Sequence, residues 1–91
     1  MINLVWDEKF RRIFKKWSLQ HPDLVPLFRE RLDLFVSDSF HPTLRVHSLS
    51  GILQGLWAMR ITYDQRLIFR FMDEAHTIAL LIDIGTHDKV Y

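Results

Sequence analysis

The stretch LWAMRITYDQRLIFRFMDEAHTIALLIDI, residues 56–84, decides the fold of this chain. It contains three runs of aliphatic and aromatic residues, which predict strands at Leu56–Thr62, Arg66–Met72 and Thr77–Ile84. Short polar segments separate the three runs, and connections of this length favour antiparallel hairpins. The C-terminal half of the chain is therefore predicted to form a small, mainly antiparallel sheet.

Alternation along these strands predicts which face of the sheet each side chain occupies. We expect Thr62 opposite Arg66 and Met72 opposite Thr77, which places Asp83 opposite Arg66. In this register the apolar face against the helices carries Trp57, Met59, Ile61, Leu67, Phe69, Phe71, Ile78, Leu80 and Ile82. The opposite face carries Arg60, Arg66, Arg70, Thr77 and Asp83. An ion pair between Arg66 and Asp83 is a structural alternative to a binding role for Arg66.

Two amphipathic helices are predicted before the sheet. After Asp7, a candidate N-cap, apolar residues recur with helical spacing at Phe10, Ile13, Phe14 and Trp17. A second set with the same spacing comprises Leu24, Leu27, Phe28, Leu32 and Phe35. Residues 2–6 form a short apolar run, and residues 37–55 have the composition of a loop. The resulting order, β-α-α-β-β-β, is that of an α+β fold with a two-helix hairpin packed on a small sheet.

Length and composition exclude several classes of protein. With 91 residues, the chain is expected to form a single domain over residues 1–91. It has no cysteine, so neither a disulfide nor a thiolate metal site is possible. The N-terminus lacks the pattern of a signal peptide, and no apolar run has the roughly 20 residues of a membrane span, so we expect a cytoplasmic protein that does not associate with membranes. The net charge of only +1 means that nucleic-acid binding would depend on local clusters of cations.

The C-terminal segment carries the side chains best suited to chemistry. His87 and Tyr91 follow directly on the last predicted strand, where rigid structure can support a site. The alternative is that His87 is an ordinary surface residue. The chain contains no Gly-rich phosphate loop, nucleophile elbow or metal-binding His-Glu-x-x-His helix. Two histidines with Asp64 match no recognised zinc spacing, so no metal or other cofactor is expected.

Three segments resemble the RelE superfamily of toxins from bacterial type II toxin-antitoxin modules, and most closely its YafQ-like mRNA interferase branch. They are LQGLW at residues 53–57, RITYDQRLIFR at 60–70 and IGTHDKVY at 84–91. The resemblance implies a RelE-like fold and an endoribonuclease that cleaves mRNA on the ribosome without a metal. It also implies a cognate antitoxin as partner, in a toxin-antitoxin heterooligomer, with a homodimer as another possible assembly.

The same resemblance suggests the residues of an active site. His47, Asp64, His87 and Tyr91 match positions that line the RNA site in this branch, and the first three are the suggested catalytic residues. Arg66 matches an arginine that other RelE-type toxins use on the scissile phosphate. Arg60 stands where the branch has a histidine, and we assign it to substrate binding. One histidine would act as base and the other as acid near neutral pH. Asp64 would orient an imidazole or hold the substrate, the arginines would bind phosphate, and Tyr91 would stack on a base.

Two other functions are compatible with the sequence. A noncatalytic RelE-like or ParE-like protein would act by binding gyrase, or would bind only its antitoxin. A plain interaction domain would use Arg66 structurally and would be insensitive to loss of His87. Convergence of His47, Asp64, His87 and Arg66 in one cleft would favour the nuclease, because proton transfer requires hydrogen-bond reach.

Overall fold

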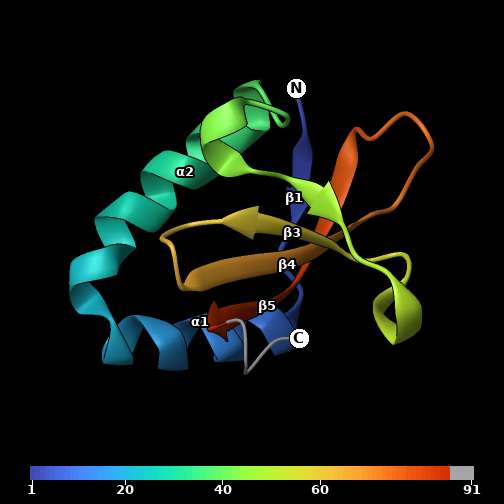
Figure 1. The fold of residues 1–91 in the computed structure, drawn as a ribbon. Helices are drawn as coiled ribbons and strands as arrows, with labels where there is room; N and C mark the ends of the chain where they lie inside the picture. The colour runs from blue at the N-terminus through green and yellow to red at the C-terminus, as the bar shows by residue number, and fades with distance from the viewer. Residues whose placement is uncertain (87–91) are drawn as a thin grey trace.

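A five-stranded sheet with the strand order β1-β5-β4-β3-β2 forms the centre of the structure (Figure 1). The strands are β1 at Asn3–Val5, β2 at His47–Ser48, β3 at Trp57–Arg60, β4 at Gln65–Phe71 and β5 at Ile78–Thr86. β1 runs parallel to β5, and the other neighbours are antiparallel. The structure, a computed structural model, describes residues 1–86. The predicted α+β fold is confirmed, with the two-residue strand β2 as an addition inside the predicted loop.

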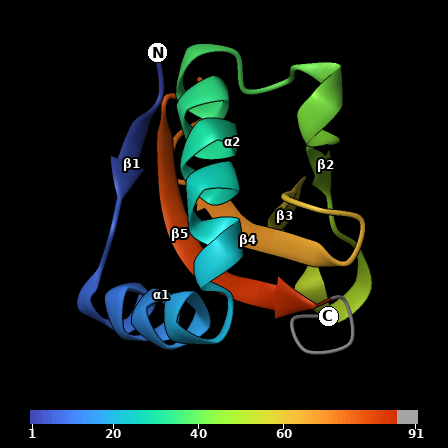
Figure 2. The ribbon, with the colours of Figure 1, turned by 90° about the vertical axis from the view of Figure 1, so that its left-hand side faces the viewer.

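The two helices pack on one face of this sheet (Figure 2). They are α1 at Glu8–Gln20 and α2 at Val25–Ser37, and they diverge from a 3-10 turn at Pro22–Leu24. Asp7 caps α1 as predicted, because its Oδ1 accepts the backbone N–H of Phe10 at 2.8 Å. No helix within residues 1–86 is long and apolar enough to cross a membrane.

The core lies between the helices and the sheet and is rich in aromatic rings. Phe35 of α2 is fully buried and meets Phe69 of β4 edge-on, with 4.8 Å between ring centroids. Trp17 of α1 donates from Nε1 to Oε1 of Gln65 at 3.0 Å. This hydrogen bond satisfies a polar side chain that is only 3% exposed, which avoids the cost of burying an unpaired amide.

The strand register differs from the prediction in both hairpins. Arg60, not Thr62, lies opposite Arg66 in the first hairpin, a shift of two residues that leaves the faces of β3 and β4 unchanged. In the second hairpin Gly85, not Asp83, lies opposite Arg66. A β-bulge causes part of this change, because Phe69 pairs with Leu81 and Ile68 with Asp83, so Ile82 is an extra residue on β5.

The faces of β5 before the bulge are consequently reversed relative to the prediction, whereas Asp83 and Ile84 after it keep the predicted faces, because they pair with Ile68 and Leu67. Ala79, Leu81 and Ile84 belong to the buried core, in place of the expected Ile78, Leu80 and Ile82. The β4–β5 loop also includes Thr77, because the Asp73 carboxylate accepts the backbone N–H groups of Thr77 and Ile78 and the hydroxyl of Thr77. Thr77 therefore does not join the cationic face of the sheet.

Replacing Asp73 with asparagine is expected to remove an acid-dependent part of the stability. The hydrogen bond from the Thr77 hydroxyl, with the backbone N–H groups of Ile78 and Thr77, lowers the pKa of Asp73 below its usual value. A lowered pKa in the folded state stabilises the protein above the pKa of the unfolded chain, about 3.9, and this contribution disappears as the pH falls through the folded value. Urea unfolding should therefore show wild type more stable than Asp73→Asn at pH 6, with a smaller gap at pH 3. A gap that stays constant between these pH values would contradict this role.

Candidate functional site

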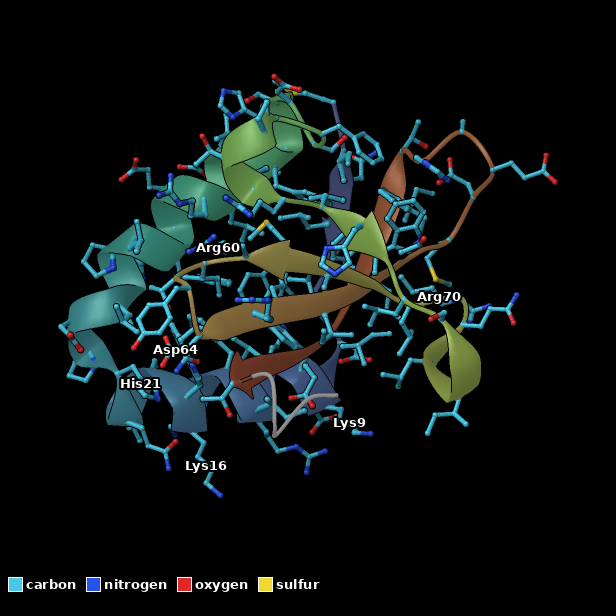
Figure 3. The ribbon with its side chains drawn as sticks, viewed as in Figure 1. Lys9, Lys16, His21, Arg60, Asp64 and Arg70 are labelled. Carbon is cyan, nitrogen blue, oxygen red and sulfur yellow. The ribbon has the colours of Figure 1, made fainter. Side chains whose placement is uncertain are left out.

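The face of the sheet opposite the helices carries a pair of facing arginines. Arg60 of β3 lies directly opposite Arg66 of β4, next to the turn that joins the two strands. Arg70 lies on the same face of β4, toward the other end of the sheet (Figure 3). The predicted cationic face is thus confirmed for these three arginines.

A hollow of about 470 Å³ lies over the facing arginines, lined by Arg45, Val46, His47, Arg60 and Arg66. We call it the His47 pocket. His47 reaches it from β2, because this short strand pairs with β3 and sets His47 beside Ala58. Of the six predicted site residues, the structure brings together His47, Arg60 and Arg66.

A backbone carbonyl favours one tautomer of the neutral His47 ring. Its Nδ1 lies 2.8 Å from the carbonyl oxygen of Arg45, and because a carbonyl only accepts, Nδ1 carries the proton. The neutral ring then has its lone pair on Nε2, the nitrogen that a general base would use. Arg45 itself has a left-handed backbone with φ of 47°, which is uncommon for a residue with a side chain.

Arg66 is anchored by the β3–β4 turn. Its Nη1 donates to the carbonyl oxygens of Thr62 and Tyr63, each at 3.0 Å. The guanidinium has five N–H donors, and within residues 1–86 only those on Nη1 make hydrogen bonds, so the donors on Nε and Nη2 can bind a ligand in the pocket. The expected pairing of Arg66 with Asp83 is wrong, since the register separates the two and Oδ1 of Asp83 accepts the backbone N–H of Ile84.

Asp64 lies in the same turn but does not line the His47 pocket. It is exposed, and its Oδ1 accepts the hydroxyl of Thr62 at 2.8 Å (Figure 3). Thr62 in turn provides one of the carbonyls that hold Arg66. The structure therefore connects Asp64 to the pocket through the turn and not through a direct contact with the space above the arginines.

His87 and Tyr91 fall outside the described residues. The strand that precedes them ends beside the site, because Gly85 pairs with Arg66 and Thr86 with Gln65. Within residues 1–86 the structure contains no group of three or more His, Cys, Asp or Glu residues placed to hold a metal ion.

Arg45 is a pocket residue that the sequence analysis missed. It lines the His47 pocket and provides the carbonyl that orients His47. Arg45 lies two residues before His47, and in a continuous strand this spacing would place both side chains on the same face. Arg45 precedes β2 and follows the 3-10 turn at Pro42–Leu44, so alternation did not apply to it.

Comparison with solved structures identifies the fold. Neither a protein-family model nor a curated protein matches the chain. Among solved structures, YafQ from E. coli matches with a TM-score of 0.78 at 15% identity, covering 100% of this chain and 99% of YafQ. This chain has the fold of the YafQ toxin. The expected resemblance to RelE-superfamily toxins is thus confirmed for the fold.

Two further toxins extend the comparison beyond YafQ. A YoeB/ParE toxin from Agrobacterium tumefaciens has a TM-score of 0.74 at 20% identity, covering 94% of this chain and 99% of that toxin. A copper-bound mutant toxin from Helicobacter pylori has a TM-score of 0.77 at 21% identity, with 100% of both chains covered. The matches also include a chain of the E. coli DinJ-YafQ toxin-antitoxin complex. The YafQ fold therefore accounts for the full length of the described structure.

Proposed function

We propose that this chain is the toxin of a toxin-antitoxin module and an endoribonuclease that cleaves mRNA on the ribosome. The observation that carries the proposal is the His47 pocket, in which a histidine with an available Nε2 meets the facing guanidinium groups of Arg60 and Arg66. The YafQ fold supports the same function, because the pocket lies on the sheet of a fold shared with known toxins.

The reaction that suits such a pocket is attack of an RNA 2′-hydroxyl on the adjacent phosphorus. A base removes the 2′-hydroxyl proton while the 2′-oxygen forms a new bond to phosphorus. The bond from phosphorus to the 5′-oxygen breaks, and an acid protonates that departing oxygen. The products are a 2′,3′-cyclic phosphate and a free 5′-hydroxyl. Charge builds up on the phosphate oxygens during the reaction, and fixed cationic donors stabilise it.

We assign each step to a residue of this chain. His47 accepts the 2′-hydroxyl proton at Nε2, since Nδ1 is held by the Arg45 carbonyl. Arg66 and Arg60 bind the phosphate oxygens, and a planar guanidinium suits this task because it donates in parallel to two oxygens. Asp64 acts as a positioning residue through Thr62 and the turn that holds Arg66.

The remaining two assignments rest on the resemblance and the chain order. We propose that His87 is the acid and that Tyr91 stacks on a base of the substrate. Both residues follow β5, whose last residues pair with the strand of Arg66.

The proposed partners are a cognate antitoxin protein, mRNA and the ribosome. The solved complex of YafQ with DinJ, described as toxin and antitoxin, supports the first. A toxin-antitoxin heterooligomer is therefore our proposal for the assembled state, and a homodimer is the alternative. We place the protein in the cytoplasm, where mRNA and ribosomes are found.

A noncatalytic binding protein is the second candidate. It would act on gyrase or bind only its antitoxin. Two observations favour it: Arg60 stands where the YafQ-like branch has a histidine, and Asp64 does not line the His47 pocket. The described pocket consequently contains one histidine, and the nuclease needs the second proton-transfer group from His87.

Controlled expression of wild type and His47→Ala in a bacterial host distinguishes the candidates. Wild type is expected to arrest growth and to create new 5′-hydroxyl ends in mRNA, and His47→Ala should abolish both effects. His41→Ala is the matched control, because His41 is outside the His47 pocket. Arrest that persists in His47→Ala without new RNA ends would instead support the binding protein.

A further inference from the structure

A second hollow lies beside the His47 pocket and shares part of its wall. It measures about 530 Å³ and extends from β3 and the β3–β4 turn to α2. Arg45 and Arg60 line both hollows, so they stand at the boundary between them. We call the second hollow the flanking groove. Arg31 of α2 and Tyr63 of the turn line the flanking groove but not the His47 pocket. They are the two side chains of the groove best suited to contact a nucleic acid.

Charge is concentrated along the two hollows. Arg31, Arg45, Arg60 and Arg66 line them, which is four of the 12 Lys and Arg residues of a chain with net charge +1. Among the described residues, no Asp or Glu lines either hollow. A continuous cationic path in a nearly neutral protein favours an extended anion with several charges over a single ion.

The flanking groove also has the apolar and aromatic parts that single-stranded nucleic acid requires. Leu27, which is half-buried, provides apolar surface, and Tyr63 lies at the turn with 77% of its surface exposed. Unpaired bases stack on exposed aromatic rings while arginines follow the backbone, and each stacked base contributes about 1–3 kcal/mol to binding. A peptide rich in acidic residues would use the arginines but would gain less from the ring.

We propose that the flanking groove binds the nucleotide next to the scissile phosphate of single-stranded RNA, with Arg31 on its phosphate and Tyr63 on its base. This inference rests on the proposed function, since it takes the His47 pocket as the place where the RNA is cut. It implies that productive binding needs a second phosphate besides the scissile one, so a dinucleotide that carries only the scissile phosphate should bind more weakly.

The salt dependence of RNA binding tests the role of Arg31. The probe is a mixed-sequence ten-nucleotide 2′-O-methyl RNA, which cannot be cleaved because every 2′-hydroxyl is blocked. Loss of one phosphate contact lowers the slope of log K against log salt concentration by about 0.7 for a single strand. We expect this decrease in Arg31→Gln, together with about tenfold weaker binding at 0.1 M salt. Arg29→Gln is the matched control, because Arg29 lies on the same helix, is exposed and is outside the groove.

Substitutions of Tyr63 test the stacking contact on the same probe. Tyr63→Ala is expected to weaken binding about fivefold or more, whereas Tyr63→Phe should bind as wild type does. The backbone carbonyl of Tyr63 that holds Arg66 is present in both variants. A loss in Tyr63→Phe equal to that in Tyr63→Ala would overturn the assignment of the ring.

Several outcomes would overturn the inference as a whole. An unchanged slope in Arg31→Gln, or an equal decrease in Arg29→Gln, would show that the groove makes no specific phosphate contact. Weaker binding of a ten-residue poly-glutamate peptide in Arg31→Gln, with RNA binding unaffected, would assign the groove to an acidic protein. Because the RNA probe cannot be cut, absence of nuclease activity together with the expected slope change would reject the proposed function and leave the groove as a binding site for single-stranded RNA. Cleavage by wild type without a slope change in Arg31→Gln would support the proposed function and reject the groove assignment.

Discussion

Arg66→Gln is expected to lower the rate of mRNA cleavage about 10²-fold to 10³-fold. In the proposed mechanism the Arg66 guanidinium, which lines the His47 pocket, stabilises the charge that develops on the phosphate. Loss of one such donor has a cost of this size in other enzymes. The donors on Nη1 hold the turn carbonyls at 3.0 Å, so the remaining donors approach the substrate from a fixed position. Single-turnover cleavage of ribosome-bound mRNA by purified protein measures the effect.

Arg70→Gln provides the control for total charge. Arg70 lies on the same face of β4 as Arg66 but is exposed and does not line the His47 pocket. Its replacement removes one positive charge and should change the rate by less than about threefold, since exposed charges are screened by salt. Thermal unfolding of both variants checks that the turn still folds. Equal rate losses in the two variants would mean that general attraction of RNA, and not the position of Arg66, accounts for the effect.

Elements that are encoded by local sequence signals could be predicted correctly. Asp7 and the apolar residues from Phe10 to Trp17 predicted α1 correctly, because capping and helical spacing act within a few residues. The faces of β3 and β4 were also predicted correctly, although the register was wrong. A shift of two residues between Arg66 and its partner preserves alternation, so the error did not move any side chain to the other face.

The faces of β5 could not be predicted from alternation. Residues 78–82 are all apolar, so either face of the strand could have been assigned to the core. The β-bulge at Ile82 and the loop in which Asp73 binds Thr77 determine which of these residues face the core. The bulge and the loop both depend on pairing with β4, so the sequence of β5 alone does not predict them.

The candidate site was predictable only in part for a similar reason. Arg60 and Arg66 followed from strand alternation, and His47 followed from the family resemblance. Arg45 lines the pocket because it adopts a left-handed conformation after a 3-10 turn and because the two-residue strand β2 pairs with β3. Neither feature could be predicted from the sequence. Arg31 lines the flanking groove because α2 lies beside the β3–β4 turn. These two arginines come from segments that have no sequence pattern relating them to the sheet.

Phe35→Ala is expected to destabilise the folded protein by about 3–5 kcal/mol, which is the range for removing a fully buried phenylalanine. Phe35 has no exposed surface and packs between α2 and the sheet against Phe69. Small domains have total stabilities of about 5–15 kcal/mol, so the variant should lose a large part of its folding free energy. Urea unfolding monitored by tryptophan fluorescence measures the change. Phe40→Ala is the matched control, because Phe40 stacks on Phe71 but is 52% exposed, and we expect a loss of about 1 kcal/mol or less.

Comparison of Phe35→Ala with Arg66→Gln separates folding from chemistry. Phe35 lines neither the His47 pocket nor the flanking groove, so its loss should reduce cleavage only in proportion to the fraction of unfolded protein. The rate per folded molecule should therefore remain near that of wild type. Arg66→Gln should show the opposite pattern, with most of the folded protein retained and the rate per folded molecule reduced. A large decrease in the rate per folded molecule of Phe35→Ala would contradict this division, and would mean that packing of α2 on β4 sets the geometry of the arginines on the opposite face of the sheet.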